Sequence, residues 1–164
     1  MSDEAKSGRK EDLPLSKAAE YLLDECRMVL PGIQALFGFQ LIVVFNPGFD
    51  SKLGAGEQRV HLAAIALVVL AIALIMTPAA YNRQIAPREI TESFVLISTR
   101  LLLCSMLPLA IAISLDFYLI AETILNSPLA AVLAAILFMS FFMLWFALPR
   151  VRALQRLLQA NVRG

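Results

Sequence analysis

Residues 25–45 read ECRMVLPGIQALFGFQLIVVF. From residue 28 onward the stretch carries no charge, and about 20 mostly apolar residues in a helix cross a hydrocarbon core of about 30 Å. The stretch nevertheless begins with charged side chains, contains a Pro-Gly pair and carries two glutamines. It therefore predicts a membrane-spanning helix with polar groups that need an explanation.

Two further charge-free runs, residues 62–82 and 123–149, are also long enough to span. A long helical pattern between them, about 94–121, has a charge-free core at residues 101–115. The whole chain is 59% hydrophobic and 16% charged, with a mean hydropathy of +0.74, whereas soluble domains carry about 25% charged residues. The predicted fold is all-α: a polytopic membrane protein with four transmembrane helices in one bundle.

The first and last segments of the chain differ in character from the spans. Residues 1–14 are polar and predict a disordered cytoplasmic tail. From residue 15, helical periodicity with an acidic polar face predicts an amphipathic surface helix that leads into the first span. Residues 150–164 predict a basic amphipathic tail, and the two flanking helices have complementary charges, so we expect them to pack together beneath the membrane.

The expected membrane domain covers residues 15–149. Pro87 predicts the start of the third helix, and Asn126-Ser127-Pro128 predicts the cap and first turn of the fourth. The four spans are expected at about residues 28–46, 61–80, 94–121 and 128–148.

Lysines and arginines predict how the chain is threaded. The two terminal segments and the second loop together hold eleven, while the first loop holds only Lys52 and Arg59. Because basic residues concentrate on the cytoplasmic side, we expect a multi-pass protein of the cell inner (plasma) membrane with both termini cytoplasmic.

Several function classes lack support in the sequence. His61 is the single histidine, so one chain cannot supply a bis-histidine haem site. Nucleotide-binding, hydrolase and zinc-protease fingerprints are absent, and a net charge of +1 gives no case for nucleic acid. We therefore expect no enzyme activity, and no catalytic, cofactor-binding or metal-binding residues. The expected partners are the lipid bilayer, a second copy of the chain or an unidentified membrane protein.

Arg100 lies within the apolar part of the third span. An arginine at the bilayer centre costs about 2.5–3.5 kcal/mol on insertion scales. Its side chain either extends to lipid phosphates, forms an ion pair with Glu25 or Asp24, or serves transport.

Asp116 lies near the other end of the same span. It is about 24 Å from Arg100 along a helix, so the two cannot pair within one chain. Asp116 is either an interface carboxylate or a cation or proton site with His61 or Gln40 nearby.

The polar residues of the first span suggest different neighbours. Arg27, Gln34 and Leu41 are seven residues apart and share a face, and we expect Gln34 to face the other spans. Gln40 is turned about 120° away from Gln34. Such amides either join helices by hydrogen bonds or line a polar cavity.

Two segments resemble a family of small bacterial four-span membrane proteins of unknown function. The resemblance is carried by an L-P-G-x-Q-x-L-F motif at residues 30–37 and by a P-A-A-Y-N-R segment at residues 78–83, and it covers roughly residues 20–150. Some relatives in that family bear the label sodium:proton antiporter. Asn82 stands where the family pattern suggests histidine, which weakens a proton relay at that position.

Three function classes remain. The first prediction is a non-enzymatic structural or accessory four-helix protein. The alternative is a small ion or proton transporter or channel, sodium:proton antiporter-like, acting as an oligomer because four helices leave little room for a pore. A membrane enzyme or cofactor protein is the third. The residues that bear on the alternative are polar and at membrane depth: Arg100, Asp116, Gln34, Gln40, Glu25 and Arg27.

Overall fold

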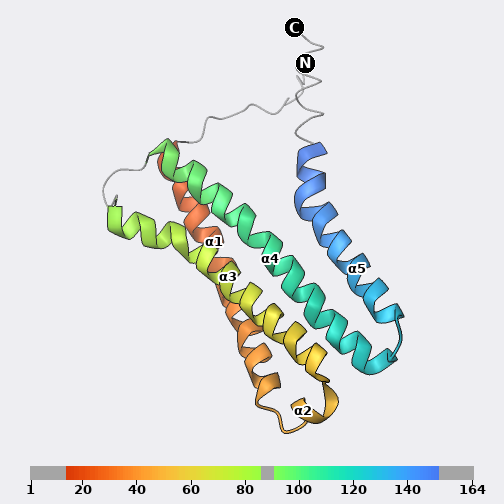
Figure 1. The fold of residues 1–164 in the computed structure, drawn as a ribbon. Coiled ribbons are helices and arrows are strands. Elements are labelled where there is room, and N and C mark those ends of the chain that lie inside the picture. The colour runs from red at the N-terminus through yellow and green to blue at the C-terminus, as the bar shows by residue number, and fades with distance from the viewer. Residues whose placement is uncertain (1–13, 86–90, 152–164) are drawn as a thin grey trace, which may run out of the picture.

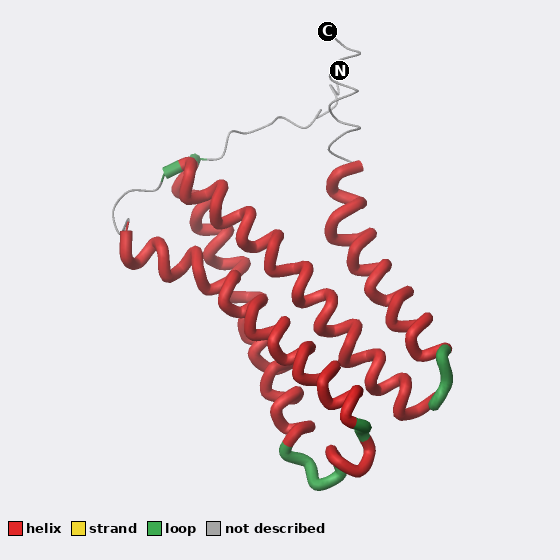
Figure 2. Tube along the Cα trace, viewed as in Figure 1, coloured by secondary structure: helices red, strands yellow, loops and turns green. Residues whose placement is uncertain are grey.

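A computed structural model describes residues 14–85 and 91–151, and all regular structure in these ranges is helical. The structure has four long helices, a short helix in the first loop and a π-helical turn near the end of the fourth long helix, and Figures 1 and 2 show how the helices are arranged. The elements are α1 (Leu15–Val44), α2 (Phe49–Lys52), α3 (Ala55–Ile85), α4 (Glu92–Leu125), α5 (Leu129–Phe142) and the π-helix η1 (Met143–Ala147).

The prediction of an all-α fold with four spans is confirmed. Four helical segments are long and apolar enough to cross a membrane, and the chain is accordingly a multi-pass membrane protein. These segments are Leu15–Val44, Ala55–Gln84, Glu92–Leu125 and Leu129–Val151.

Packing among the four long helices is unequal. The pair α3 and α4 makes the most extensive contact, α1 packs against both of them, and α5 packs mainly on α4 (Figure 1). Few residues of α5 are buried, and its outer surface is apolar. The core of the molecule therefore lies between α1, α3 and α4.

Heptad spacing explains how these three helices meet. The buried residues of α1 lie seven apart, at Ala19, Cys26, Ile33 and Gln40. Those of α3 alternate steps of three and four, at His61, Ala64, Val68, Ala71, Ile75 and Pro78. On α4, the buried seam includes Ser98, Ser105, Ala112 and Leu119, again seven apart. Small residues dominate these seams, so the helix axes approach closely and van der Waals contact holds them together in lipid.

Helix α1 runs without interruption from Leu15 to Val44, so it includes both the expected surface helix and the expected first span. Pro31 lies inside it and removes one backbone donor without ending the helix. The expected tails are described only at residue 14 and at residues 150 and 151. The rest of both tails, Pro87 and the expected contact between the flanking helices lie outside the described residues.

Two helix boundaries bear on the sequence predictions. The described part of the third span begins at Glu92, where the Thr91 side chain accepts a hydrogen bond from the Phe94 amide at 3.3 Å. The segment Asn126-Ser127-Pro128 is expected to supply the cap and first turn of the fourth helix; Pro128 directly precedes its first residue, Leu129, and Ser127 Oγ accepts from the Leu129 amide at 3.4 Å. Asn126 itself ends α4, in a left-handed conformation with φ of 44°, which asparagine tolerates better than most residues.

Candidate functional site

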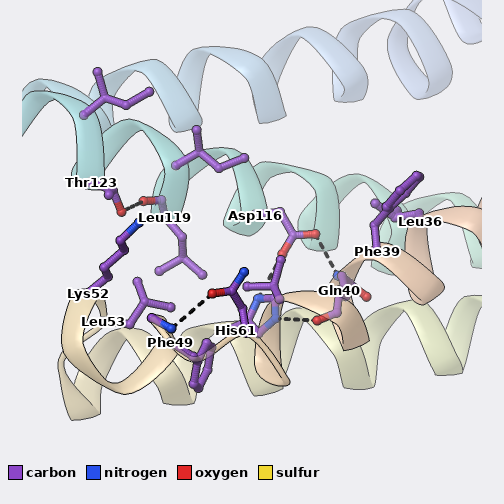
Figure 3. A pocket seen from close by; sticks show the side chains of 15 residues that line it. Leu36, Phe39, Gln40, Phe49, Lys52, Leu53, His61, Asp116, Leu119 and Thr123 are labelled. Carbon is purple, nitrogen blue, oxygen red and sulfur yellow. Dashed lines mark hydrogen bonds and ion pairs between the residues drawn. The ribbon is translucent and has the colours of Figure 1, made fainter.

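Three polar side chains meet where α1, α3 and α4 pack together at the end next to α2 (Figure 3). Gln40 of α1 and His61 of α3 are only 3% and 5% exposed, and the Asp116 side chain of α4 is 17% exposed. The Gln40 side-chain amide donates to Asp116 Oδ2 at 2.7 Å. His61 Nδ1 lies 3.5 Å from Asp116 Oδ1. We call these three residues the polar cluster.

The hydrogen bond on the far side of the histidine ring fixes its tautomer. His61 Nε2 lies 3.1 Å from the backbone carbonyl oxygen of Gln40. A carbonyl oxygen only accepts, so Nε2 carries a hydrogen. In a neutral ring Nδ1 is then a lone-pair acceptor, and it faces another acceptor, Asp116 Oδ1. A single proton resolves this mismatch, either on Nδ1 as imidazolium or on Oδ1 as carboxylic acid.

Two oxygens of the polar cluster are buried without a hydrogen-bond partner among the described residues. They are Gln40 Oε1 and Asp116 Oδ1. The second lies within ion-pair distance of His61 Nδ1, but it receives no hydrogen bond of acceptable geometry there. An unsatisfied buried acceptor costs about 1–3 kcal/mol, so both oxygens are suited to a bound donor or cation.

A cavity of about 450 Å³ adjoins the polar cluster (Figure 3). One wall consists of the polar cluster itself. Apolar side chains of α1 and α4 form much of the remaining wall, and Lys52 of α2 lines the same cavity. Most of these apolar side chains are exposed on the outside of the helices, whereas Leu36 is half-buried and Leu119 is buried. The apolar wall is formed by Leu36, Phe39, Val43, Leu119, Ile120 and Ile124.

The first loop is held over this cavity by its own hydrogen bonds. The Asn46 side chain accepts from the Gly48 amide at 3.1 Å, and the Glu57 carboxylate accepts from the Gly54 amide at 2.7 Å. Gln58 donates to the Leu53 carbonyl oxygen at 3.0 Å. These bonds position α2 so that the Phe49 ring lies 5.8 Å from the His61 ring. The loop thereby packs the Phe49 ring against the His61 ring.

The polar cluster brings together Asp116, Gln40 and His61, as the cation or proton interpretation of Asp116 expected. The position of His61 on α3 is the sequence feature that could have identified it as part of the site. It continues the buried seam of α3 by one step of three residues before Ala64, so it points into the bundle and not to the interface.

The prediction that Gln34 faces the other spans is wrong, because Gln34 is exposed on the surface of α1. The face of α1 that packs contains Cys26, Ile33 and Gln40, one residue out of register with the predicted face.

The charged candidates at the other end of the molecule do not join the polar cluster. Arg100 and Glu25 are exposed, and Arg100 forms no ion pair with any side chain of residues 14–85 or 91–151. Asp24 instead pairs with Arg27 of its own helix at 3.3 Å, and both side chains are largely exposed. Of the alternatives for Arg100, the ion pair with Glu25 or Asp24 is therefore not formed.

A second cavity, of about 440 Å³, lies between α1 and α3 at that other end. Arg27, Asn82 and Arg83 line it together with apolar residues and Cys26. The two cavities are separated by the buried apolar core around Ile33 and Val68. In the described ranges, no three histidine, cysteine, aspartate or glutamate side chains gather as a metal site would need.

Comparison with known proteins places the chain in a family but assigns no activity. No curated protein and no solved structure matches it. A family described as "Family of unknown function (DUF6328)" matches residues 12–149. This range includes the whole polar cluster, both cavities, the first three spans and all but the last two residues of the fourth. The chain therefore belongs to this family of unknown function, DUF6328.

Proposed function

We propose that this protein is a small proton-coupled transporter that binds one proton at the pair formed by His61 and Asp116. The observation that carries the proposal is the unsatisfied Asp116 Oδ1, which faces a ring nitrogen that also lacks a proton in the neutral tautomer. Ionisable residues within membrane spans are costly, and they mark ion and proton pathways more often than structural contacts. This proposal favours the transporter over the accessory protein.

The arrangement of the cavities supports the same proposal. One cavity reaches the polar cluster from the α2 end, and the other enters between α1 and α3 from the opposite end. Along α1, the apolar core between Leu30 and Leu36 is about 9 Å thick. A carboxylate reached from one side only, behind a closed apolar barrier, is what alternating access requires of one of its states.

The remaining features of the proposal follow from the sequence. We place the protein in the bacterial inner membrane with both termini cytoplasmic, acting without a cofactor and without enzyme activity. We expect it to work as an oligomer, because the described helices pack around a filled core and leave no pore between them. The antiporter label of relatives in the resembling family agrees with this class but does not identify the ion.

Proton movement in vesicles tests the proposal. Purified protein is reconstituted with a trapped pH-sensitive dye, and gradients of Na⁺, K⁺ or an organic ammonium ion are imposed separately. Wild type is expected to move protons faster than protein-free vesicles under at least one gradient, and Asp116→Asn is expected to abolish this movement. Glu122→Gln, six residues along the same helix, and Arg100→Leu are the controls and should retain it. Absence of protein-dependent proton movement under all three gradients would overturn the proposal.

The accessory role remains a second candidate because of α5. This helix buries Ala130 and Ala134 against its neighbour but leaves Ala131 and Ala135 exposed, with small-x-x-x-small spacing on the outer surface. Such spacing favours close packing against another transmembrane helix. If α5 is an assembly surface, Ala131→Leu should weaken cross-linked oligomers in the membrane, whereas Val132→Leu should not. Unchanged cross-linking in Ala131→Leu would remove the support for this role.

A further inference from the structure

The cavity beside the polar cluster is lined by Asp116 and Gln40, each of which has a buried oxygen without a hydrogen-bond partner among the described residues, and by apolar side chains of α1 and α4. We propose that it binds an amphipathic primary amine, with the ammonium group on the Asp116 carboxylate and the apolar body along α1 and α4. The geometry of the cavity alone supports amine binding, whereas the role of the amine as the exchanged substrate rests on the proposed function. The cavity volume of about 450 Å³ lies within the range of small-molecule sites, about 300–1,000 Å³.

The number of oxygens favours an ammonium group over a metal cation. Hard metal cations such as Mg²⁺ and Ca²⁺ take six or more oxygen ligands. The polar cluster offers only two unsatisfied oxygens. An ammonium group needs fewer oxygen partners than these metals, and its N–H donors form charge-assisted hydrogen bonds with a carboxylate.

The apolar wall of the cavity determines which alkyl or aryl body the amine can carry. Phe39, Val43, Ile120 and Ile124 line the cavity and are also exposed on the outer surface of α1 and α4. In a bilayer these side chains face hydrocarbon, so an alkyl or aryl body lying along them is covered by lipid on its other side. Lys52 also lines the cavity, and its charge disfavours a second cationic group. The site therefore selects monoamines over polyamines.

The amine and the shared proton cannot occupy the site at the same time. With the proton present, the pair of His61 and Asp116 is neutral overall. When R–NH₃⁺ binds to the Asp116 carboxylate, that group must be ionised, and His61 must be neutral to avoid two cations side by side. One H⁺ therefore leaves for each R–NH₃⁺ that enters. The exchange conserves charge at the site.

Few other titratable groups face Asp116. On α3 the group is His61, and on α2 it is Lys52, which lines the cavity. The described part of α1 brings Gln40 to this end and carries its charged side chains at the other end, before residue 28. The helix α5 contains no titratable side chain between Leu129 and Phe142. The pH dependence of amine binding is therefore assigned to the pair of His61 and Asp116.

Binding to the full-length wild-type protein in lipid nanodiscs tests the inference without any variant. The probe is the fluorescent amine 2-(1-naphthyl)ethylamine, and the matched neutral probe is 2-(1-naphthyl)ethanol. The amine should bind at least about tenfold more tightly than the alcohol, and should release one proton per molecule bound in weakly buffered solution. Its affinity should fall about tenfold for each pH unit below the pH at which the pair takes up its shared proton. Equal binding of the two probes would identify a lipid groove and overturn the inference.

Variants locate the binding. Asp116→Asn and Gln40→Leu should weaken amine binding at least about tenfold, while Glu122→Gln and Gln34→Leu on the same two helices should leave it unchanged. Amine binding that is independent of pH, or unaffected by Asp116→Asn in protein that remains folded by circular dichroism, also contradicts the inference. A proton flux driven by Na⁺ or K⁺ together with no amine binding would overturn this inference alone. Amine binding without any proton flux would overturn the proposed function alone.

Discussion

Asp116 depends on a single side chain for its one well-formed hydrogen bond. Gln40 donates to Oδ2 at 2.7 Å across helices that are 76 residues apart in sequence. Without that donor, the carboxyl group keeps only the longer contact to His61. Both residues sit in a partly desolvated seam, so the loss is not compensated by water. Replacing Gln40 is therefore expected to change both the free energy of unfolding of the bundle and the hydrogen bonding of Asp116.

We predict that Gln40→Leu destabilises the protein and that Gln34→Leu does not. Removing the Gln40 amide leaves Asp116 less satisfied, at a cost of about 1–3 kcal/mol. Gln34 is exposed on the same helix, so its replacement should change stability by less than about 0.5 kcal/mol. Thermal unfolding in detergent, followed by circular dichroism, measures the difference. A lower midpoint for Gln34→Leu than for Gln40→Leu would contradict the assignment of the packed face.

The polar cluster was only partly predictable from sequence. The residue types at membrane depth indicated Asp116, with Gln40 and His61 as its neighbours. The register of α1 was not predictable, because each of the two neighbouring faces carries one glutamine: Gln40 on the face that starts at residue 26 and Gln34 on the face that starts at residue 27. The seam of Cys26, Ile33 and Gln40 is selected by contact with α3 and α4, which no local pattern in α1 encodes.

Among the helices, α3 and α4 make the most extensive contact in the bundle. Ala64, Val68 and Ala71 of α3 are fully buried, and Ala112 of α4 belongs to the same core as Val68. In lipid the gain comes from close van der Waals contact and not from removal of apolar surface from water. Small side chains are therefore required at these positions.

We predict that Ala71→Leu destabilises the bundle by about 1–3 kcal/mol through overpacking. Ala73, two residues further along α3, is exposed, and Ala73→Leu should be tolerated because the new side chain faces lipid. Midpoints of thermal unfolding for both variants in the same detergent give the comparison. Equal midpoints would show that α3 packs through another face.

The end of α4 gives a second prediction at the scale of the element. Asn126 has φ of 44°, and its amide donates to the Glu122 carbonyl oxygen at 2.8 Å. Glycine adopts this conformation without strain, whereas a β-branched residue pays at least about 1–2 kcal/mol. Asn126→Gly should therefore match or exceed the wild-type unfolding midpoint, and Asn126→Val should lower it. The opposite order would exclude the left-handed cap.

The helix ends were less predictable than the helices themselves. The segment Asn126-Ser127-Pro128 contains residues that suit the start of a helix and residues that suit its end. Ser127 Oγ does accept weakly from the Leu129 amide at 3.4 Å, while the backbone of Asn126 closes α4. Both functions fit within three residues because the turn is tight. Local propensity cannot decide which residue takes which function.

For the whole molecule, the existence of four spans follows from hydropathy alone, because backbone groups in lipid must be satisfied within helices. The order of packing does not follow from hydropathy. All four spans are apolar enough to insert, yet α5 packs mainly on α4 and buries few residues. The difference lies in where small and polar residues fall on each face, and these positions acquire meaning only when the partner helix is known.

Threading of the chain through the membrane is the prediction at this largest scale. The starts of α1 and α4 and the C-terminal end of the fourth span lie at one end of the bundle, and α2 lies at the other (Figure 1). Basic residues are concentrated at the first end, so that end should be cytoplasmic. In protein with Cys26→Ala and Cys104→Ala, a membrane-impermeant maleimide should label Ser51→Cys in intact spheroplasts and Arg150→Cys only after permeabilisation.

The same labelling experiment bears on the direction from which the polar cluster is reached. Lys52 of α2 lines its cavity, so a labelled Ser51→Cys places the mouth of that cavity on the outer side of the membrane. An amine that enters there would displace the site's proton to the same side, and the core around Ile33 must open before either ion reaches the cytoplasm. Labelling of Arg150→Cys in intact spheroplasts, with Ser51→Cys protected, would reverse both the threading and this direction of access.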